Sequence, residues 1–313
     1  LMEYGDQADL VTEFVQNSDD AGARHLVFLL RGESFGTECV VDPRTAALQG
    51  PALYVCSDRP LSAEDIARMQ TVGHSKKRLE VGSSGRFGVG LNVMYRYCDC
   101  PQLLANGRLH YFDLTRSFVA KPGMKRGRKF TEEKLRQNFP DSYAPFEGDA
   151  VAAKFPTVFR LALRAERSEL GLRMDLRSVR EELRHAASVA DKMLLFTKRL
   201  HRLEFHDGAS PLATHEAVLK DREAHEAFFA ELPTSPLDFK VGCLHTYLAQ
   251  RSISTETAGG EASVADWVIT HRIGVTDDAM YEVLKAQFER PHGVALLPHG
   301  AAAVRVKPFE PAR

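Results

Sequence analysis

The stretch EFVQNSDDA at residues 13–21 decides the fold, together with GRFGVG at residues 85–90. On a helix with about 100° per residue, Glu13, Asn17 and Asp20 lie within roughly 60° of one another, so a carboxylate, an amide and a second carboxylate share one face. The closely spaced glycines of the second stretch let backbone N–H groups approach a phosphate without a Cβ in the way. A phosphate cradle and a helix that carries a base and a metal-binding amide together predict an ATP site.

The composition is that of an ordinary globular protein. The 313 residues suffice for two domains or for one enlarged α/β domain; 44% of them are hydrophobic and 27% are charged. The formal net charge of −1 gives no global field that would recruit nucleic acid or an anionic membrane. No apolar run reaches the ~18 residues of a transmembrane helix, and no signal peptide is evident, so we expect a cytoplasmic protein with no membrane partner. Five scattered cysteines, an odd number, fit reduced thiols in that compartment.

Hydrophobic periodicity predicts a chain in which helices and strands alternate. We expect helices at residues 7–21, 62–73, 88–97, 175–198, 213–231 and 277–289. We expect strands at residues 25–30, 52–56, 108–114, 158–164, 200–205, 237–249, 264–273 and 293–297. The intervening residues 121–150 begin with a short basic run, which we interpret as a solvated surface excursion rather than as a nucleic-acid patch.

The two motifs resemble those of the GHKL, or Bergerat-fold, ATPases, a superfamily that includes gyrase B subunits, ninety-kilodalton heat-shock chaperones and MutL proteins. The helix motif of that superfamily is E-x-x-x-N-x-x-D-A, and the chaperone branch has a G-x-F-G-V-G loop; both patterns occur here in that order. Within the superfamily the chain looks most like the repeating regions of sacsin-type proteins. That similarity runs through QNSDDAGA (16–23), GPALYVCSD (50–58), GRFGVGLNVMYRYCDCP (85–101), PGMKRGRKF (122–130) and TVFRLALR (157–164).

The resemblance implies a role for each matched residue. Glu13 would be the catalytic general base, and Asn17 would hold Mg²⁺, which bridges the phosphates. Asp58 would accept the adenine amino group, with Asp20, Ala21 and Thr157 near the ribose and adenine. The remaining implied nucleotide-binding residues form the lid (Gly73, Lys76, Lys77) and the phosphate cradle (Gly85, Arg86, Phe87, Gly88, Val89, Gly90).

The chain also departs from the superfamily pattern at the adenine end. The second motif of the superfamily is D-x-G-x-G, whereas Asp58 is followed by Arg59-Pro60-Leu61-Ser62, so both glycines are replaced. Ser62 could narrow the pocket, and we expect the adenine end to be remodelled. The chaperones take a catalytic arginine from a following domain. The strand arginines Arg160 and Arg164 are interpreted as structural or surface residues instead.

These observations predict an α/β fold of the α+β two-layer sandwich type, with a mixed, largely antiparallel sheet and helices on one face. Residues 1–165 would form the Bergerat-fold ATP-binding domain, and residues 166–313 a helical linker with a smaller α/β extension. The expected function is a Mg-ATP-binding, slowly hydrolysing ATPase module of a sacsin-like chaperone or co-chaperone, with ATP or ADP and Mg²⁺ as cofactors and client proteins or co-chaperones as partners. The alternatives are a degenerate nucleotide-binding switch or scaffold without hydrolysis, and a MutL- or topoisomerase-like ATPase that acts on DNA.

Overall fold

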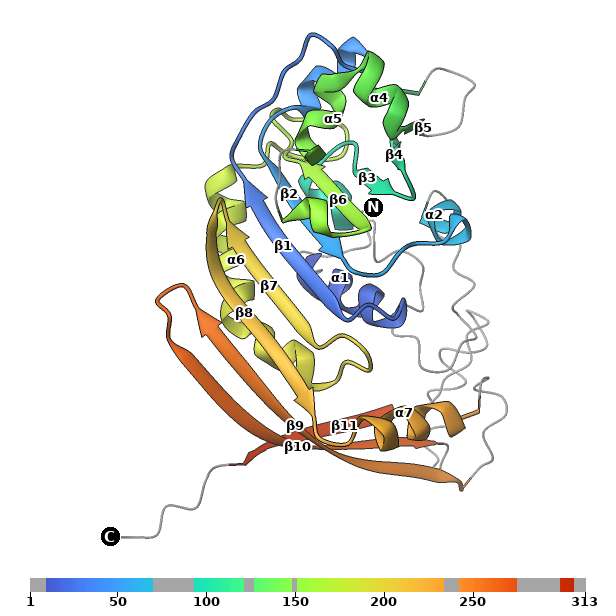
Figure 1. Ribbon diagram of the computed structural model, residues 1–313, viewed down its shortest axis with the longest axis vertical. Helices are drawn as coiled ribbons and strands as arrows, with labels where there is room; N and C mark the ends of the chain where they lie inside the picture. Colours follow the sequence, from blue (N-terminus) through green and yellow to red (C-terminus); the bar gives the residue numbers. More distant parts are fainter. Residues whose placement is uncertain are drawn as a thin grey trace.

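The computed structural model describes residues 10–69, 93–120, 127–147, 151–233, 242–274 and 299–306. Its described strands form one eleven-stranded sheet in the order β11-β10-β9-β8-β7-β1-β2-β6-β3-β4-β5 (Figure 1). Among the described strands, β1 and β7 pair in parallel and every other neighbouring pair is antiparallel. The expected α+β architecture with a mixed, largely antiparallel sheet is therefore confirmed. The sheet runs without interruption past residue 165, where the sequence suggested a boundary between two domains.

The first half of the sheet comprises β1 (His25–Arg31), β2 (Ala52–Ser57), β3 (Gln102–Ala105), β4 (Arg108–Tyr111), β5 (Arg128–Thr131) and β6 (Thr157–Ala162). The second half comprises β7 (Arg202–Asp207), β8 (Ser210–Leu219), β9 (Leu244–Thr257), β10 (Ala262–Gly274) and β11 (His299–Val306). The α-helices are α1 (Leu10–Asp20), α2 (Ala63–Met69), α3 (Met94–Tyr97), α4 (Glu132–Asn138), α5 (Pro140–Glu147), α6 (Leu176–Val189) and α7 (Arg222–Glu231). Short 3₁₀ turns are η1 (Pro43–Leu48), η4 (Ala152–Lys154) and η5 (Ala190–Leu195).

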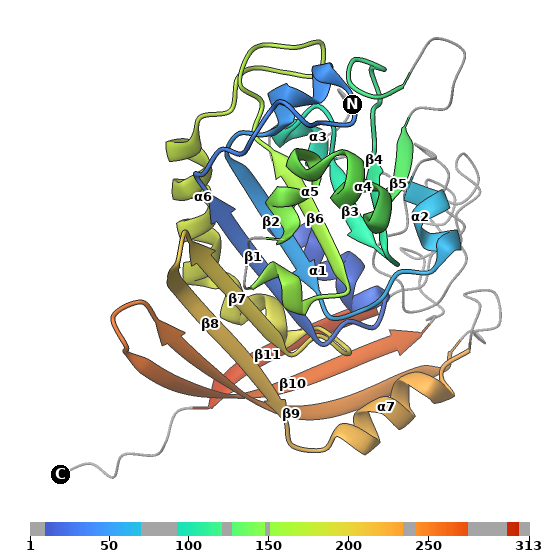
Figure 2. The ribbon, with the colours of Figure 1, turned by 45° about the horizontal axis from the view of Figure 1, so that its top comes forward.

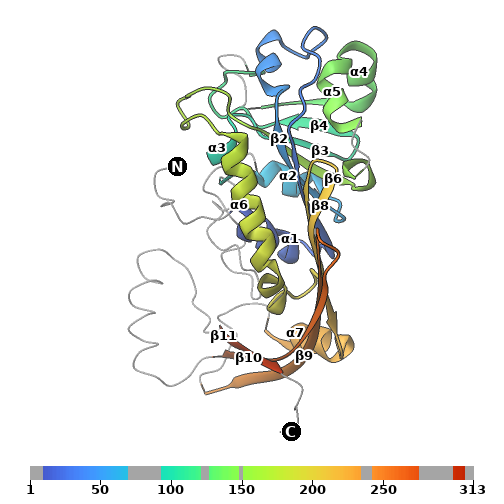
Figure 3. The ribbon, with the colours of Figure 1, turned by 90° about the vertical axis from the view of Figure 1, so that its left-hand side faces the viewer.

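Helices cover both faces of the central strands (Figure 3). β1 and β2 are buried along nearly their whole length, which explains why they read as continuous apolar runs rather than as alternating patterns. Phe28 of β1 belongs to one core together with α1 and α6, whereas Val27 and Leu29 belong to a second core beneath α4 and α5. The sequence predicted helices on one face of the sheet. The smaller layer of α4 and α5 on the other face was not expected.

Two stretches differ from the sequence prediction. Residues 213–231 were expected to form one helix, but β8 occupies Ser210–Leu219 and α7 begins only at Arg222 (Figure 2). Residues 127–147 do not form a solvated surface loop. They form the edge strand β5 and the helices α4 and α5, and Leu135 of α4 is fully buried. The strands around the Gly259-Gly260 turn are longer than expected. The helix at 277–289 and the strand at 293–297 lie outside the described residues.

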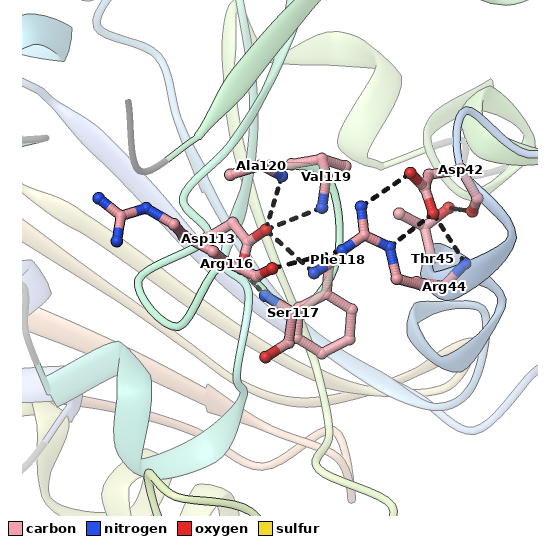
Figure 4. A network of polar contacts seen from close by, with 9 residues as sticks. All are labelled: Asp42, Arg44, Thr45, Asp113, Arg116, Ser117, Phe118, Val119 and Ala120. Carbon is pink, nitrogen blue, oxygen red and sulfur yellow. Dashed lines mark hydrogen bonds and ion pairs between the residues drawn. The ribbon is translucent and has the colours of Figure 1, made fainter. Parts of the chain in front are cut away.

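The loop after β4 is organised by one buried carboxylate (Figure 4). Asp113 is fully buried and accepts hydrogen bonds from the backbone N–H groups of four consecutive residues, 117–120, at 2.8 to 3.0 Å. Beside it, Arg44 forms an ion pair with Asp42 (2.9 Å) and donates to the carbonyl of Arg116 (3.3 Å). The Arg44 guanidinium holds the pKa of Asp42 below its ordinary value. Asp113 thus holds the loop by its backbone N–H groups, and Arg44 connects the loop to η1.

The parallel junction between β1 and β7 carries a charged cluster around Glu204. His206 and His25 approach its carboxylate oxygens at 3.2 and 2.9 Å, and Arg202 donates to it at 2.7 Å. Contacts with His206, His25 and Arg202 hold the pKa of Glu204 far below its ordinary value. A carboxylate with a lowered pKa stabilises the fold at pH values above its unfolded pKa of about 4.3, and this contribution is lost as the pH falls toward the folded pKa.

We expect Glu204→Gln to lower the free energy of unfolding by about 1–3 kcal/mol at pH 7, because three partners lose a charged acceptor. The difference from the wild type should shrink as the pH is lowered below about 4. Urea denaturation at several pH values measures both effects. Glu216→Gln is the matched control on the neighbouring strand, since the Glu216 side chain is 42% exposed and its contact with Arg202 is 3.4 Å. Equal losses in the two variants would contradict a special role for Glu204.

Candidate functional site

Helix α1 presents the predicted functional face because its opposite face is anchored in the core. Phe14 packs edge-on against Phe28 of β1 and Phe159 of β6, with ring centroids 6.4 and 5.2 Å apart. Leu10, Val11 and Val15 are buried on the same side of the helix. This apolar stripe fixes the rotation of α1 over the central strands and leaves the face with Glu13 and Asn17 partly exposed.

Glu13 and Asn17 have the environments that a base and a metal ligand need. Burial raises the pKa of Glu13 above its ordinary value, and no described residue forms an ion pair with its carboxylate. The amide nitrogen of Asn17 donates to the carbonyl oxygen of Glu13 at 2.7 Å. That bond fixes the orientation of the amide, and Oδ1 of Asn17 accepts no hydrogen bond from the described part of the chain. An amide oxygen without a donor and a half-buried carboxylate therefore stand one turn apart.

The two neighbouring aspartates at the end of α1 have different partners. Asp19, which the sequence analysis did not single out, accepts hydrogen bonds from the backbone N–H groups of Lys198, Arg199 and Leu200 at 2.7 to 2.9 Å. Asp20, the predicted ribose-side residue, has a side chain that is 2% exposed and lies 3.6 Å from the Lys198 ammonium. Ala21 follows and begins the turn that ends α1. In the sequence, the one sign of this backbone-binding role of Asp19 is that it stands directly beside the motif residue Asp20.

Asp58 directly follows the buried strand β2, as expected. Its Oδ1 accepts the backbone N–H groups of Arg24 and His25 at 3.0 and 3.1 Å, while no described residue donates to Oδ2. Thr157 pairs with Ser57 across the β2–β6 ladder, is almost completely buried and donates its hydroxyl to the carbonyl of Arg59 at 2.7 Å. The segment after Asp58, in which the superfamily glycines are replaced, is therefore hydrogen-bonded to Thr157. Oδ2 of Asp58 and the hydroxyl oxygen of Thr157 can each still accept a hydrogen bond.

The two strand arginines are structural, as the sequence analysis proposed. Arg160 is fully buried and donates to Tyr54, Gln102 and the carbonyls of Leu48 and Gly50. Arg164 is bound to Asp99 at 2.6 Å and donates to carbonyl oxygens in α3, at Cys98 directly after α3 and in the loop after β6. Neither side chain is available to a ligand.

The remaining predicted site residues cannot be placed. Gly73, Lys76 and Lys77 of the expected lid, and Gly85, Arg86, Phe87, Gly88, Val89 and Gly90 of the expected cradle, lie outside the described residues. The described part of the site thus comprises the α1 face, Asp58 at the end of β2 and Thr157 at the start of β6.

Comparison with known proteins identifies the family. The family model described as "Sacsin domain" matches residues 1–218, which is more than half of the chain. The chain belongs to the sacsin domain family. Among curated proteins, sacsin of Homo sapiens is 29% identical over 217 residues, which is 66% of this chain and 5% of that protein. The sacsin domain therefore includes α1, β2 and β6, which carry the described candidate site, whereas β9–β11 lie beyond the match.

Within the described ranges of this sacsin domain chain, every helix is too short or too polar to span a bilayer.

Proposed function

We propose that this chain is a Mg-ATP-binding and slowly hydrolysing module of the GHKL type, within a sacsin-like chaperone or co-chaperone. The observation that carries the proposal is the α1 face. There, a carboxylate with a burial-raised pKa stands one turn from an amide whose oxygen is uncommitted. Phosphoryl transfer requires positioned charges and a positioned water more than covalent chemistry, and these two groups supply both. ATP and client proteins or co-chaperones are the proposed partners, and the cytoplasm is the proposed compartment.

The described residues fit the groups that such a site must hold. Asn17 would contribute one oxygen ligand to Mg²⁺, which when bound neutralises charge on the phosphates. Glu13 would orient and deprotonate a water, a task for which a raised pKa is favourable. Asp58 would accept the adenine amino group through Oδ2, because Oδ1 is already bound to the backbone of Arg24 and His25. The glycine cradle at residues 85–90 would hold the phosphates through backbone N–H groups.

Calorimetric titration with ATP and ADP in the presence of Mg²⁺ tests the proposal. We expect Asn17→Ala to weaken ATP binding in Mg²⁺ about tenfold, because the metal loses a protein ligand. Gln16→Ala is the matched control, since Gln16 is exposed on the same helix. Absence of binding at millimolar nucleotide by folded protein, or equal affinity of the two variants, would contradict the proposed site.

A nucleotide-binding switch without hydrolysis is the second candidate. The observation that favours it is the arrangement after β2, where the Thr157 hydroxyl is bound to Arg59 within the segment that replaces the superfamily glycines. A rearranged adenine end is compatible with binding that is uncoupled from turnover. Phosphate release from Glu13 variants separates the two candidates.

A further inference from the structure

A basic pocket is lined in part by the 198–200 loop, whose backbone N–H groups donate to Asp19. It is a small depression that is partly open to solvent. The residues that line it come from the segment before β1, the loop before β7, β8, the first turns of α7 and β9: Arg24, Lys198, Arg199, Leu200, His201, Ala217, Leu219, Arg222, Glu226 and Arg251. Five of these lining residues carry a permanent positive charge, and Glu226 is the one among them that carries a carboxylate.

Most of this positive charge is not neutralised by neighbouring side chains. No ion pair joins Arg24, Arg199 or Arg222 to a carboxylate within the described ranges. Lys198 lies 3.6 Å from Asp20, so its charge is shared with the end of α1. Like charges held together at a concave surface raise the local potential and attract an anion. The side chains that line the pocket therefore carry a net positive charge, which the nearby carboxylates of Asp19 and Asp20 reduce in part.

Arg251 gives the pocket a fixed, buried cation. It is 3% exposed, and its terminal nitrogens donate to the carbonyls of Leu194 and Thr197 rather than to a carboxylate. Its buried Nε–H has no hydrogen-bond acceptor in the described structure. Burial lowers the pKa of Arg251 to about 10, which still leaves the side chain charged at neutral pH. The buried Asp19 carboxylate also acts on Arg251 and partly offsets its charge, and a bound anion would add to that compensation.

We propose that this pocket is a binding site for a phosphate-type oxyanion, separate from the proposed nucleotide site, which it borders through the contacts of Lys198 with Asp20 and of Arg24 with Asp58. Guanidinium groups bind phosphate oxygens through charge-assisted, often bidentate hydrogen bonds, and three of the lining residues are exposed arginines without a carboxylate partner in the described ranges. The ligand is inorganic phosphate or the phosphate of a small phosphorylated molecule. The proposal rests on the basic pocket alone and does not require that the chain hydrolyse ATP.

A ³¹P NMR titration with inorganic phosphate at fixed ionic strength tests the site. We expect the wild type to bind phosphate in the millimolar range or tighter. The double variant Arg199→Ala/Arg222→Ala should bind about tenfold more weakly, because it lacks two charged donors. Arg173→Ala/Arg177→Ala is the matched control: it also removes two exposed arginine charges, but these lie outside the pocket. That control should bind phosphate like the wild type, and affinity should fall as salt is raised.

A second pair of measurements separates this pocket from the nucleotide site. Asn17→Ala should leave phosphate binding unchanged, because Asn17 does not line the pocket. The Arg199→Ala/Arg222→Ala variant should bind ATP with the affinity of the wild type; a loss of ATP affinity in this variant would show that the pocket belongs to the nucleotide site and would overturn the proposal of a separate oxyanion site. Absence of phosphate binding by the wild type, equal weakening in the two double variants, or loss of phosphate binding in Asn17→Ala alone would overturn the proposal.

Discussion

Replacement of Asp113 by alanine is expected to lower the free energy of unfolding by about 3–5 kcal/mol. The carboxylate is fully buried and is the acceptor for the backbone N–H groups of residues 117–120. Removal of the carboxylate leaves these donors without a partner, and each unsatisfied buried donor costs about 1–3 kcal/mol unless water reaches it. The sum is limited because the loop can relax toward solvent, as in other large-to-small replacements.

Equilibrium urea unfolding measures the Asp113→Ala effect. Asp113→Asn should be intermediate, because one oxygen acceptor remains while the amide nitrogen is a donor facing other donors. Glu166→Ala is the control, since Glu166 is exposed in the loop after β6, and its effect should lie within about 0.5 kcal/mol of zero. A loss below about 1 kcal/mol in Asp113→Ala would contradict the view that this carboxylate organises the loop.

The sequence predicts the central strands and α1 well because their patterns are strong and local. Continuous apolar runs mark β1 and β2, and the stripe of Val11, Phe14 and Val15 marks the buried side of α1. The prediction of a helix at 213–231 failed because residues 210–219 are rich in residues that also favour helices. In the structure, Ala213, His215 and Ala217 alternate inward, which is the period of a strand between β7 and β9.

Residues 121–150 were misjudged for a related reason. The basic run at its start dominates the local composition, but the apolar anchors are spaced widely along the stretch. Phe130, Leu135 and Phe146 reach one core from β5, α4 and α5, and Thr131 caps α4 by accepting the N–H of Lys134. A charge run of a few residues does not outweigh buried contacts made by the segment that follows.

The sequence predicts the helix face of α1 that carries Glu13 and Asn17, but it does not predict the long-range hydrogen bonds around the candidate site. Spacing alone places Glu13 and Asn17 on one helix face, and α1 confirms that arrangement. The contacts of Asp58 with Arg24 and His25, and of Asp19 with the 198–200 loop, join residues that are 33 to 181 positions apart. Such contacts depend on how strands are ordered in the sheet, which local periodicity does not encode. Asp58 thus has a backbone-holding role that its position in the motif did not reveal.

Replacement of Glu13 by glutamine is expected to reduce ATP turnover by about 10²-fold or more, because general base catalysis typically contributes about 10²–10⁴-fold. The amide is isosteric and cannot take a proton from water, so ATP binding should be preserved. Phosphate release under single-turnover conditions measures the chemical step, and calorimetry measures the affinity. Gln16→Ala again serves as the control on the same helix.

The raised pKa of Glu13 gives the same variant a second signature. A carboxyl group whose folded pKa is above its unfolded pKa destabilises the fold when charged at neutral pH, and this cost is relieved as the pH falls through the folded pKa. Glu13→Gln should therefore raise the Tm modestly at pH 7 while it lowers turnover. In the wild type, turnover should increase with pH as the carboxyl loses its proton. Equal turnover in the wild type and Glu13→Gln would show that Glu13 is not the base, and the nucleotide-binding switch would then be the better reading of the α1 face.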